Sequence, residues 1–236
     1  MKRRLSMFIA VIVVAGLLSG AAAAAPSFLS TTGNILTPND SVLAPGDFSA
    51  NFHALNLDDN TPTVIGANVG VTESLELGIA RFDPDVRALD EETLLNAKYR
   101  LLPETASRPS VLIGVVDATG DLDRDDDPGF YIVLGKNLTS IATGLSGEPV
   151  QPIRGFIGVG TGIYNGVFLG LDWTFSAKSR IIVEYINELN IKGAFGEESV
   201  FNAGLRFALT DALRGDLALI NGEDFGFGIS YTKTGL

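Results

Sequence analysis

The sequence predicts an all-β protein, an antiparallel transmembrane β-barrel of about twelve strands that follows a cleavable signal peptide. Three observations support this fold: short segments that alternate apolar and polar residues, a leader typical of export, and charges confined to one face of the alternating segments. In residues 167–175, the odd positions are Val, Leu, Leu, Trp and Phe, whereas the even positions are Phe, Gly, Asp and Thr. Because successive strand side chains point to opposite faces, one face suits lipid and the other suits water or a partner charge. The pattern recurs about a dozen times, as in a membrane-spanning barrel.

The first 25 residues have the features of a secretory signal. Basic residues at positions 2–4 precede an apolar run over 7–18, and small residues follow over 19–25. The apolar run is too short for a retained membrane helix, and the alanines suit a signal peptidase. We therefore expect a signal peptide over 1–25, export, and residence in the outer membrane.

The remaining chain divides into an irregular segment over 26–46 and a barrel over 47–236. The irregular segment is rich in Thr, Pro, Asn and Asp. An even number of strands suits a bacterial barrel, and each predicted strand is close to the 9–11 residues that cross a bilayer at a tilt. The predicted strands are 47–55, 63–72, 75–82, 93–101, 111–118, 130–138, 153–161, 166–175, 180–187, 200–209, 213–220 and 225–232.

The lengths of the connections agree with alternating inner turns and outer loops. Counted from the periplasmic side, three inner connections are short: 72–74, 176–179 and 210–212. Three outer connections are longer and polar, as expected for extracellular loops: 83–92, 119–129 and 188–199. Residues 139–151 form a long connection where an inner turn is expected, so either that turn is elongated or the strand register is shifted there.

The two faces of the strands are predicted to meet different surroundings. The face predicted to meet lipid carries Phe48, Val69, Leu77, Tyr99, Ile113, Trp173, Tyr185, Phe207, Phe227 and Tyr231. A charge on that face would cost several kcal/mol at the bilayer midplane, which favours placing the charged face in the lumen. The predicted lumen-lining residues are Asn51, His53, Glu76, Asn96, Lys98, Arg100, Arg154, Asp172, Arg180, Glu184, Arg206, Arg214 and Asp216.

The lumen admits two interpretations. Its charges can line a small pore and select solutes, or they can pair with one another in a filled, structural interior. Bulky residues predicted to point inward narrow any channel: Phe156, Phe168, Ile182 and Ile186. A soluble antiparallel barrel or sandwich, with the apolar face inside, is a third possibility for the fold.

The amino-acid composition restricts the classes of partner that the protein is expected to bind. Without the three basic residues of the signal, fourteen basic residues remain against 28 acidic ones, so the net charge is about −14. Nucleic acid is not expected as a partner, because phosphate binding requires a basic surface. The chain has no cysteine, so it forms no disulfide and carries no lipoprotein anchor. No cofactor is predicted, and the expected partners are the lipid bilayer and the outer-membrane assembly machinery.

An acidic stretch in one predicted outer loop is a weak candidate for calcium binding. Carboxylates at alternate positions suit Ca²⁺, and here they belong to Asp121, Asp123, Asp125 and Asp127. The later glycine and distal glutamate of an EF-hand are missing, and Arg124 lies within the cluster. A solvated acidic loop is therefore the favoured interpretation.

Ser49, Asn51 and His53 share one face of the first predicted strand, and His53 is the only histidine. Residues two apart on a strand lie about 7 Å from each other, which is too far for direct proton transfer. No nucleophile motif surrounds them. We therefore predict no catalytic residue and a non-enzymatic protein, with a barrel hydrolase as the least favoured alternative.

Residues 31–40, TTGNILTPND, and 42–46, VLAPG, resemble the stretch that precedes the first strand of YjbH-type outer-membrane proteins. Residues 70–78 and 209–213 resemble strand–turn–strand phrases of the same group. The resemblance covers a single barrel module and implies an outer-membrane barrel connected with exopolysaccharide. The sequence thus predicts a small pore or an exopolysaccharide-associated barrel with a charged lumen, whose partners include polysaccharide or small solutes. The alternative is a closed structural or adhesive barrel that presents acidic outer loops.

Overall fold

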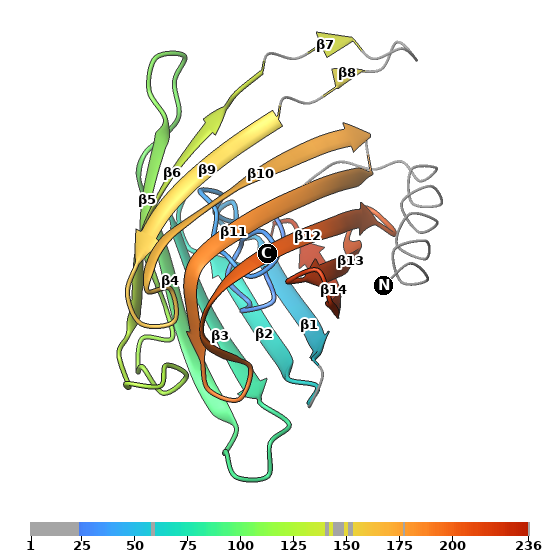
Figure 1. Ribbon diagram of the computed structural model, residues 1–236. Coiled ribbons are helices and arrows are strands. Elements are labelled where there is room, and N and C mark those ends of the chain that lie inside the picture. The colour runs from blue at the N-terminus through green and yellow to red at the C-terminus, as the bar shows by residue number, and fades with distance from the viewer. Residues whose placement is uncertain are drawn as a thin grey trace.

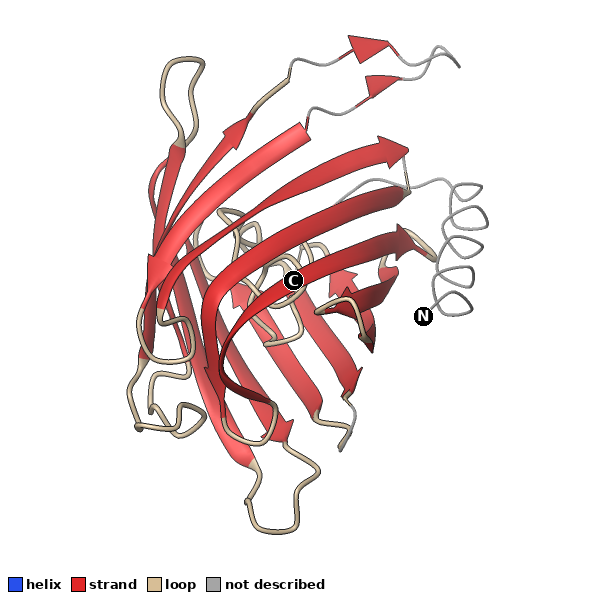
Figure 2. Ribbon diagram, in the orientation of Figure 1, coloured by secondary structure: helices blue, strands red, loops and turns tan. Residues whose placement is uncertain are grey.

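The computed structural model describes residues 24–57, 60–139, 142–143, 149–150, 153–176 and 178–235. The predicted signal peptide lies outside this part of the chain except for its last two residues. Among the described residues, no helix has the length and apolar character needed to cross a bilayer. The regular elements of this part of the chain are all strands, as Figure 2 shows.

Twelve strands form one closed antiparallel barrel, which confirms the predicted fold class. Successive strands of the barrel pair with each other, and β1 closes the barrel against β14 (Figure 1). The barrel strands are β1 (Phe48–Asn56), β2 (Thr63–Gly70), β3 (Leu75–Asp83), β4 (Glu92–Leu102), β5 (Ser110–Val116), β6 (Gly129–Asn137), β9 (Ile153–Gly160), β10 (Gly166–Ser176), β11 (Ser179–Ile191), β12 (Phe195–Ala208), β13 (Leu213–Ile220) and β14 (Asp224–Lys233).

The two ends of the barrel differ. Phe48 at the start of β1 pairs with Lys233 at the end of β14, so the wall begins and finishes at the same end, here called the terminal end. The turn 209–212 also lies there. The opposite end, here called the loop end, carries the connections 57–62, 84–91, 117–128, 161–165, 192–194 and 221–223.

The strand boundaries match the sequence prediction to within two residues, except where β11 meets β12. The prediction of an outer loop over 188–199 is wrong. Residues in this stretch continue the ladder through Leu189 opposite Glu198 and Ile191 opposite Phe195, leaving only a short turn. Leu189, Ile191 and Phe195 are buried, so packing over the lumen holds these strand ends in place.

The long connection over 139–151 does not shift the strand register. Asn137 on β6 lies opposite Arg154 on β9, so the wall continues directly across this gap in the sequence. The connection is elongated and includes a small separate sheet of β7 (Ala142–Thr143) and β8 (Pro149–Val150).

The outer wall carries exposed apolar side chains. Ile65 is 61% exposed and Phe130 is 59% exposed, and both lie on strands. Seven of the residues predicted to meet lipid are also exposed: Leu77, Tyr99, Ile113, Trp173, Tyr185, Phe227 and Tyr231. An apolar exterior on a closed barrel is the arrangement expected of a lipid-facing wall.

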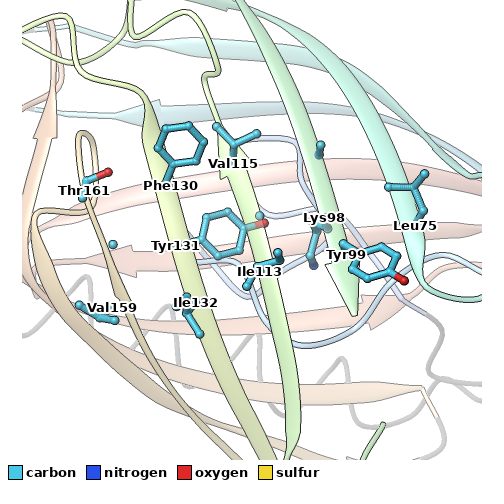
Figure 3. Close-up of a pocket in the computed structure, with 13 residues that line it drawn as sticks. Leu75, Lys98, Tyr99, Ile113, Val115, Phe130, Tyr131, Ile132, Val159 and Thr161 are labelled. Atoms are coloured by element: carbon cyan, nitrogen blue, oxygen red, sulfur yellow. The ribbon is translucent and has the colours of Figure 1, made fainter. Parts of the chain in front are cut away.

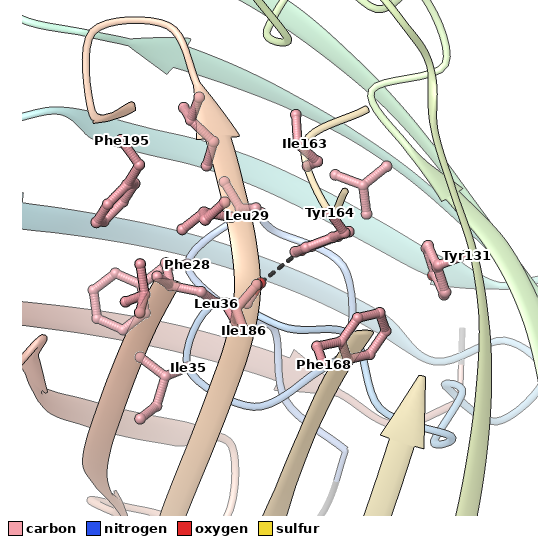
Figure 4. Packing of buried hydrophobic residues seen from close by; sticks show 14 of the residues in the cluster. Phe28, Leu29, Ile35, Leu36, Tyr131, Ile163, Tyr164, Phe168, Ile186 and Phe195 are labelled. Carbon is pink, nitrogen blue, oxygen red and sulfur yellow. Dashed lines mark hydrogen bonds between the residues drawn. The ribbon is translucent and has the colours of Figure 1, made fainter. Parts of the chain in front are cut away.

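The hydrophobic core lies inside the barrel, toward the loop end. Wall residues such as Leu94, Val116 and Phe168 are fully buried there. The N-terminal segment supplies further core residues, and Figure 4 shows them packed among the wall side chains: Phe28, Leu29, Ile35 and Leu36. The predicted inward positions of Phe156, Phe168, Ile182 and Ile186 agree with their burial.

Candidate functional site

The lumen contains the N-terminal segment of the chain. Every residue from 25 to 40 is buried, as are Val42 and Leu43, and we name residues 25–43 the plug segment. Its backbone folds on itself, since Phe28 N–H donates to the Ile35 carbonyl and Asn34 N–H donates to the Thr37 carbonyl, at 2.7 and 2.8 Å. The blue coil inside the ring of strands in Figure 1 is this segment. Most of the irregular stretch predicted over 26–46 is thus a compact coil inside the barrel, and Ala44 and Pro45 at its end are exposed.

Two wall carboxylates hold the plug segment through its backbone. Glu184 on β11 accepts hydrogen bonds from the N–H groups of Ile35, Leu36 and Thr37, at 3.3, 2.8 and 3.2 Å, and from the Thr37 hydroxyl at 2.7 Å. Glu76 on β3 is bound in the same way, by Thr32 N–H, the Thr32 hydroxyl and Leu43 N–H. Both carboxylates are 1% exposed. Charge-assisted bonds of this kind are about twice as strong as neutral ones.

Two wall cations bind carbonyl groups of the plug segment. Arg206 on β12 is anchored by Asp216 at 2.6 Å. Its guanidinium donates to four plug carbonyls, those of Ala25, Pro26, Gly33 and Asn34. Lys98 on β4 donates to the carbonyls of Thr32 and Ser41. The wall therefore binds both the N–H donors and the carbonyl acceptors of the plug backbone.

An ion pair joins the plug segment to the terminal end of the wall. Arg154 Nε donates to the Asp40 carboxylate at 2.9 Å, and Nη2 donates to its other oxygen. Arg154 also binds Glu104 at 2.7 Å, and the Ser110 hydroxyl donates to Asp40. Burial alone would raise the pKa of Asp40, but the hydrogen bonds and charge of Arg154 outweigh it and lower that pKa below its ordinary value.

Neutral polar wall residues complete the contact with the plug segment. Asn51 accepts from the Ser30 hydroxyl at 3.0 Å, and Asn96 donates to the Leu29 carbonyl at 3.3 Å. His53 lies 3.1 Å from Asn51 through Nδ1 and 3.4 Å from Asp216 through Nε2. In the described part of the chain, neither ring nitrogen of His53 bonds to a hydroxyl group, so Ser49 and His53 do not form a nucleophile–base pair.

Seven of the predicted lumen residues thus bind the plug segment directly: Asn51, Glu76, Asn96, Lys98, Arg154, Glu184 and Arg206. His53 packs its ring against Phe28 of the plug segment, with the ring centroids 4.6 Å apart, and the remaining predicted residues bind other parts of the wall. Arg180 pairs with Asp172 at 2.7 Å, and Arg100 donates to the Glu73 carbonyl near the terminal end. Arg214 donates to the Thr232 hydroxyl at 3.3 Å.

One further plug contact could not be predicted from the sequence. The hydroxyl of Tyr164, in the short connection 161–165, donates to the Leu36 carbonyl at 2.6 Å, the dashed line in Figure 4. Tyr164 is 1% exposed and lies at the loop end. A tyrosine in an irregular connection has no periodicity that would assign it to the lumen.

The acidic loop helps to cover the loop end. Leu122 is fully buried, and its carbonyl accepts from Lys192 N–H at 2.9 Å. The Asp123 carboxylate accepts from the backbone N–H groups of Asp125 and Asp127 and from the Asn190 side chain. Across the residues that the structure describes, no three acidic, His or Cys side chains converge to hold a metal ion. Asp123 therefore organises the loop itself.

A groove on the outer wall has a volume of about 530 Å³. Exposed apolar side chains of β4, β5, β6 and β9 line it, among them Tyr99, Ile113, Phe130, Ile132 and Val159 (Figure 3). Because these side chains belong to the exterior of the barrel, the groove is not a path for a polar solute through the lumen.

Comparison with known proteins shows similarity in fold. No family profile matches the chain, and no curated protein matches it in sequence. The KdgM porin is 12% identical over 78% of this chain and 98% of its own, with a TM-score of 0.53. KdgM in complex with disordered oligogalacturonate gives the same coverage and identity with a TM-score of 0.55. The Acinetobacter baumannii outer membrane protein Omp33 is 9% identical over 79% of this chain and 96% of its own, with a TM-score of 0.49.

Proposed function

We propose that this protein is a non-enzymatic outer-membrane pore that its own plug segment holds closed. The exposed apolar side chains on the outer wall support the membrane location, because water would not stabilise such an exterior. The KdgM porin, which has a similar fold, provides a precedent for a pore. The observation that carries the proposal is the occupied lumen, in which polar wall groups bind the plug segment.

The chemistry of the plug contact favours a removable plug. Glu184, Glu76 and Arg206 contact the plug through hydrogen bonds and charge, and water can replace these bonds when the segment leaves. A purely structural filling would be as stable, or more stable, with apolar side chains at these positions, because buried charges carry a desolvation cost. A charged wall remains compatible with water after the plug has left.

The solute class is also part of the proposal. A polar lumen with both signs of charge suits hydrophilic solutes, and the KdgM porin has been solved with an oligogalacturonate. The connection with exopolysaccharide rests on the resemblance of residues 31–46 to YjbH-type proteins, and we propose it on that ground alone.

A removable disulfide between plug and wall tests the pore. The Ser30 and Asn51 side chains are in contact at 3.0 Å, and the chain has no other cysteine to interfere with a pair placed there. We expect the oxidised Ser30→Cys/Asn51→Cys protein to be silent in a planar bilayer and the reduced protein to show discrete, salt-dependent openings. A matched pair at Ala50 and Ala67, which lie opposite each other on β1 and β2 and alternate with the inward-facing residues, leaves the plug free and should conduct in both states.

A closed structural barrel is the second candidate. The apolar packing at the loop end favours it, because an aqueous path there would expose buried side chains such as Leu94, Val116 and Leu122 to water. In this case the acidic loop would present a surface for adhesion. The reduced cysteine variant and the wild type would then both stay silent after folding, and that result would refute the pore.

A further inference from the structure

One buried cation of the lumen, Arg214, forms no ion pair with an acidic group among the described residues. Arg214, the second residue of β13, is 3% exposed, and its one hydrogen bond in the described structure is to the Thr232 hydroxyl at 3.3 Å. By contrast, Arg206, Arg180 and Arg154 each pair with a carboxylate at 2.9 Å or less. A guanidinium has five N–H donors, and burying a charge without a partner is costly.

Two hydroxyl groups near Arg214 also lack a hydrogen-bond partner in the part of the chain that the structure describes. Ser230 on β14 lies directly opposite Arg214 in the strand register, and Ser49 on β1 lies opposite Thr232. Both serines are buried, and among the described residues neither side-chain oxygen has a hydrogen-bond partner. Side chains directly opposite on neighbouring strands are in reach of each other, and diagonal neighbours are within reach of a long side chain. The Arg214 guanidinium and the hydroxyls of Ser230 and Ser49 therefore lie on one patch of the inner wall.

The charge of this region points to the sign of a ligand. Arg180 lies opposite Arg206 in the register, and Arg206 lies opposite Asp216, two residues along β13 from Arg214. With Asp172, which pairs with Arg180, the region holds three cations and two carboxylates. These five groups carry one net positive charge, and the Arg214 guanidinium and the two serine hydroxyls can all donate hydrogen bonds to a ligand.

We propose that Arg214, Ser230, Ser49 and Thr232 form a binding site for one carboxylate group at the terminal end of the lumen. A guanidinium fork matches the two oxygens of a carboxylate, and serine hydroxyls supply further donors. A single negative charge balances the region. This inference deepens the proposed function, because it identifies acidic solutes, such as sugars that carry carboxylates, as the class that meets the wall at this end.

The test measures binding without requiring conduction. Refolded protein in detergent is heated at constant ionic strength in acetate, in acetamide as the neutral isostere, or in chloride. We expect acetate to raise the unfolding midpoint saturably by about 5 °C, and acetamide and chloride to leave it within about 1 °C. An equal response to chloride, or no response to acetate, would overturn the proposal.

Substitutions inside and outside the proposed carboxylate site test where acetate binds. Arg214→Gln should lose the acetate response and, without acetate, should unfold at the same temperature as the wild type or higher, because it removes an unpaired buried charge. Arg108→Gln, in an exposed connection, should keep the response. A retained response in Arg214→Gln, or marked destabilisation without acetate, would show that Arg214 has another role.

A gentler variant keeps the test valid if Arg214→Gln does not fold. Ser49→Ala/Ser230→Ala removes the two unpaired hydroxyls and should raise the acetate concentration at half-response about tenfold. An unchanged concentration would overturn the assignment. A protein that binds acetate but never conducts would refute the pore and retain the carboxylate site. A protein that conducts but shows no acetate response would refute the carboxylate site and retain the pore.

Discussion

Glu184 illustrates what sequence alone can and cannot show about a single side chain. Strand alternation predicts that it points into the lumen, and in the structure the side chain is 1% exposed. Its actual partners are backbone N–H groups about 150 positions earlier in the chain, at residues 35–37. No periodicity links an irregular coil to a distant strand, so the binding of the plug segment to the wall could not be predicted from the alternation of apolar and polar residues.

Glu184→Gln should loosen the plug segment. The amide keeps one acceptor oxygen but turns an NH₂ group toward backbone donors, and losing charged hydrogen bonds should cost about 2–3 kcal/mol. We expect faster protease cleavage within residues 25–43 of the refolded protein, measured by mass spectrometry. Glu188→Gln provides the control, since the Glu188 carboxylate bonds to Asn165 at the exposed loop end of the same strand. Equal protease resistance of both variants would contradict the role of Glu184.

The Asp40–Arg154 pair should make the protein less stable in acid. The pKa of Asp40 is lowered in the folded protein, so its contribution to stability is fully present above the unfolded value of about 3.9 and is lost as pH falls through the folded value. Denaturant midpoints measured between pH 7 and pH 3 should fall in the wild type. Asp40→Asn should be less stable at pH 7 and should show a smaller fall. Asp90→Asn, in an exposed loop, should follow the wild type.

At the scale of elements, alternation of apolar and polar residues was sufficient to place the strands. It failed over 188–199, where the ladder continues with buried Leu189, Ile191 and Phe195 on one face, because a hairpin beyond the hydrocarbon layer can carry polar residues on its outer face. It was also ambiguous over 139–151, since length alone does not distinguish an elongated turn from a shifted register. The pairing of Asn137 with Arg154 resolves that question.

Shortening the 139–151 connection to a four-residue turn should leave the barrel intact. β6 and β9 pair directly with each other, from Asn137 opposite Arg154 to Tyr131 opposite Gly160. The wall therefore does not depend on residues 139–151. We expect an unchanged heat-modified mobility on a gel. The contrasting variant, Leu122→Ala in the 117–128 connection, removes a fully buried side chain and should cost about 2–4 kcal/mol. If the shortened connection proves more damaging than Leu122→Ala, the assignment of these two loops is wrong.

At the scale of the whole molecule, two separate apolar surfaces define the protein. One covers the outside of the wall, and the other fills the loop end of the lumen. The sequence predicted the first, because one face of each strand is apolar. It could not predict how far the second extends, because the apolar residues of the plug segment show no periodicity.

A charge on the outer wall distinguishes a membrane barrel from a soluble one. Ile132→Lys places a cation among exposed apolar side chains of β6 and should cost about 2–4 kcal/mol in a bilayer. Leu89→Lys, at an exposed position in a loop, should change stability by less than about 0.5 kcal/mol. The measurement is the free energy of unfolding from lipid vesicles. Equal, small effects of both variants would contradict a lipid-facing wall.

The seam between β1 and β14 has a consequence for the order of assembly. It joins the first and the last strand of the chain, so the ring cannot close until the whole polypeptide has been delivered. The plug segment precedes β1, yet it binds β11 and β12, which are made late. These contacts have long sequence separations, and such contacts make folding slow. The plug segment can therefore bind β1, β3 and β4 early, but its contacts with β11 and β12 form only after most of the wall has been made, and closure of the seam encloses it in the interior.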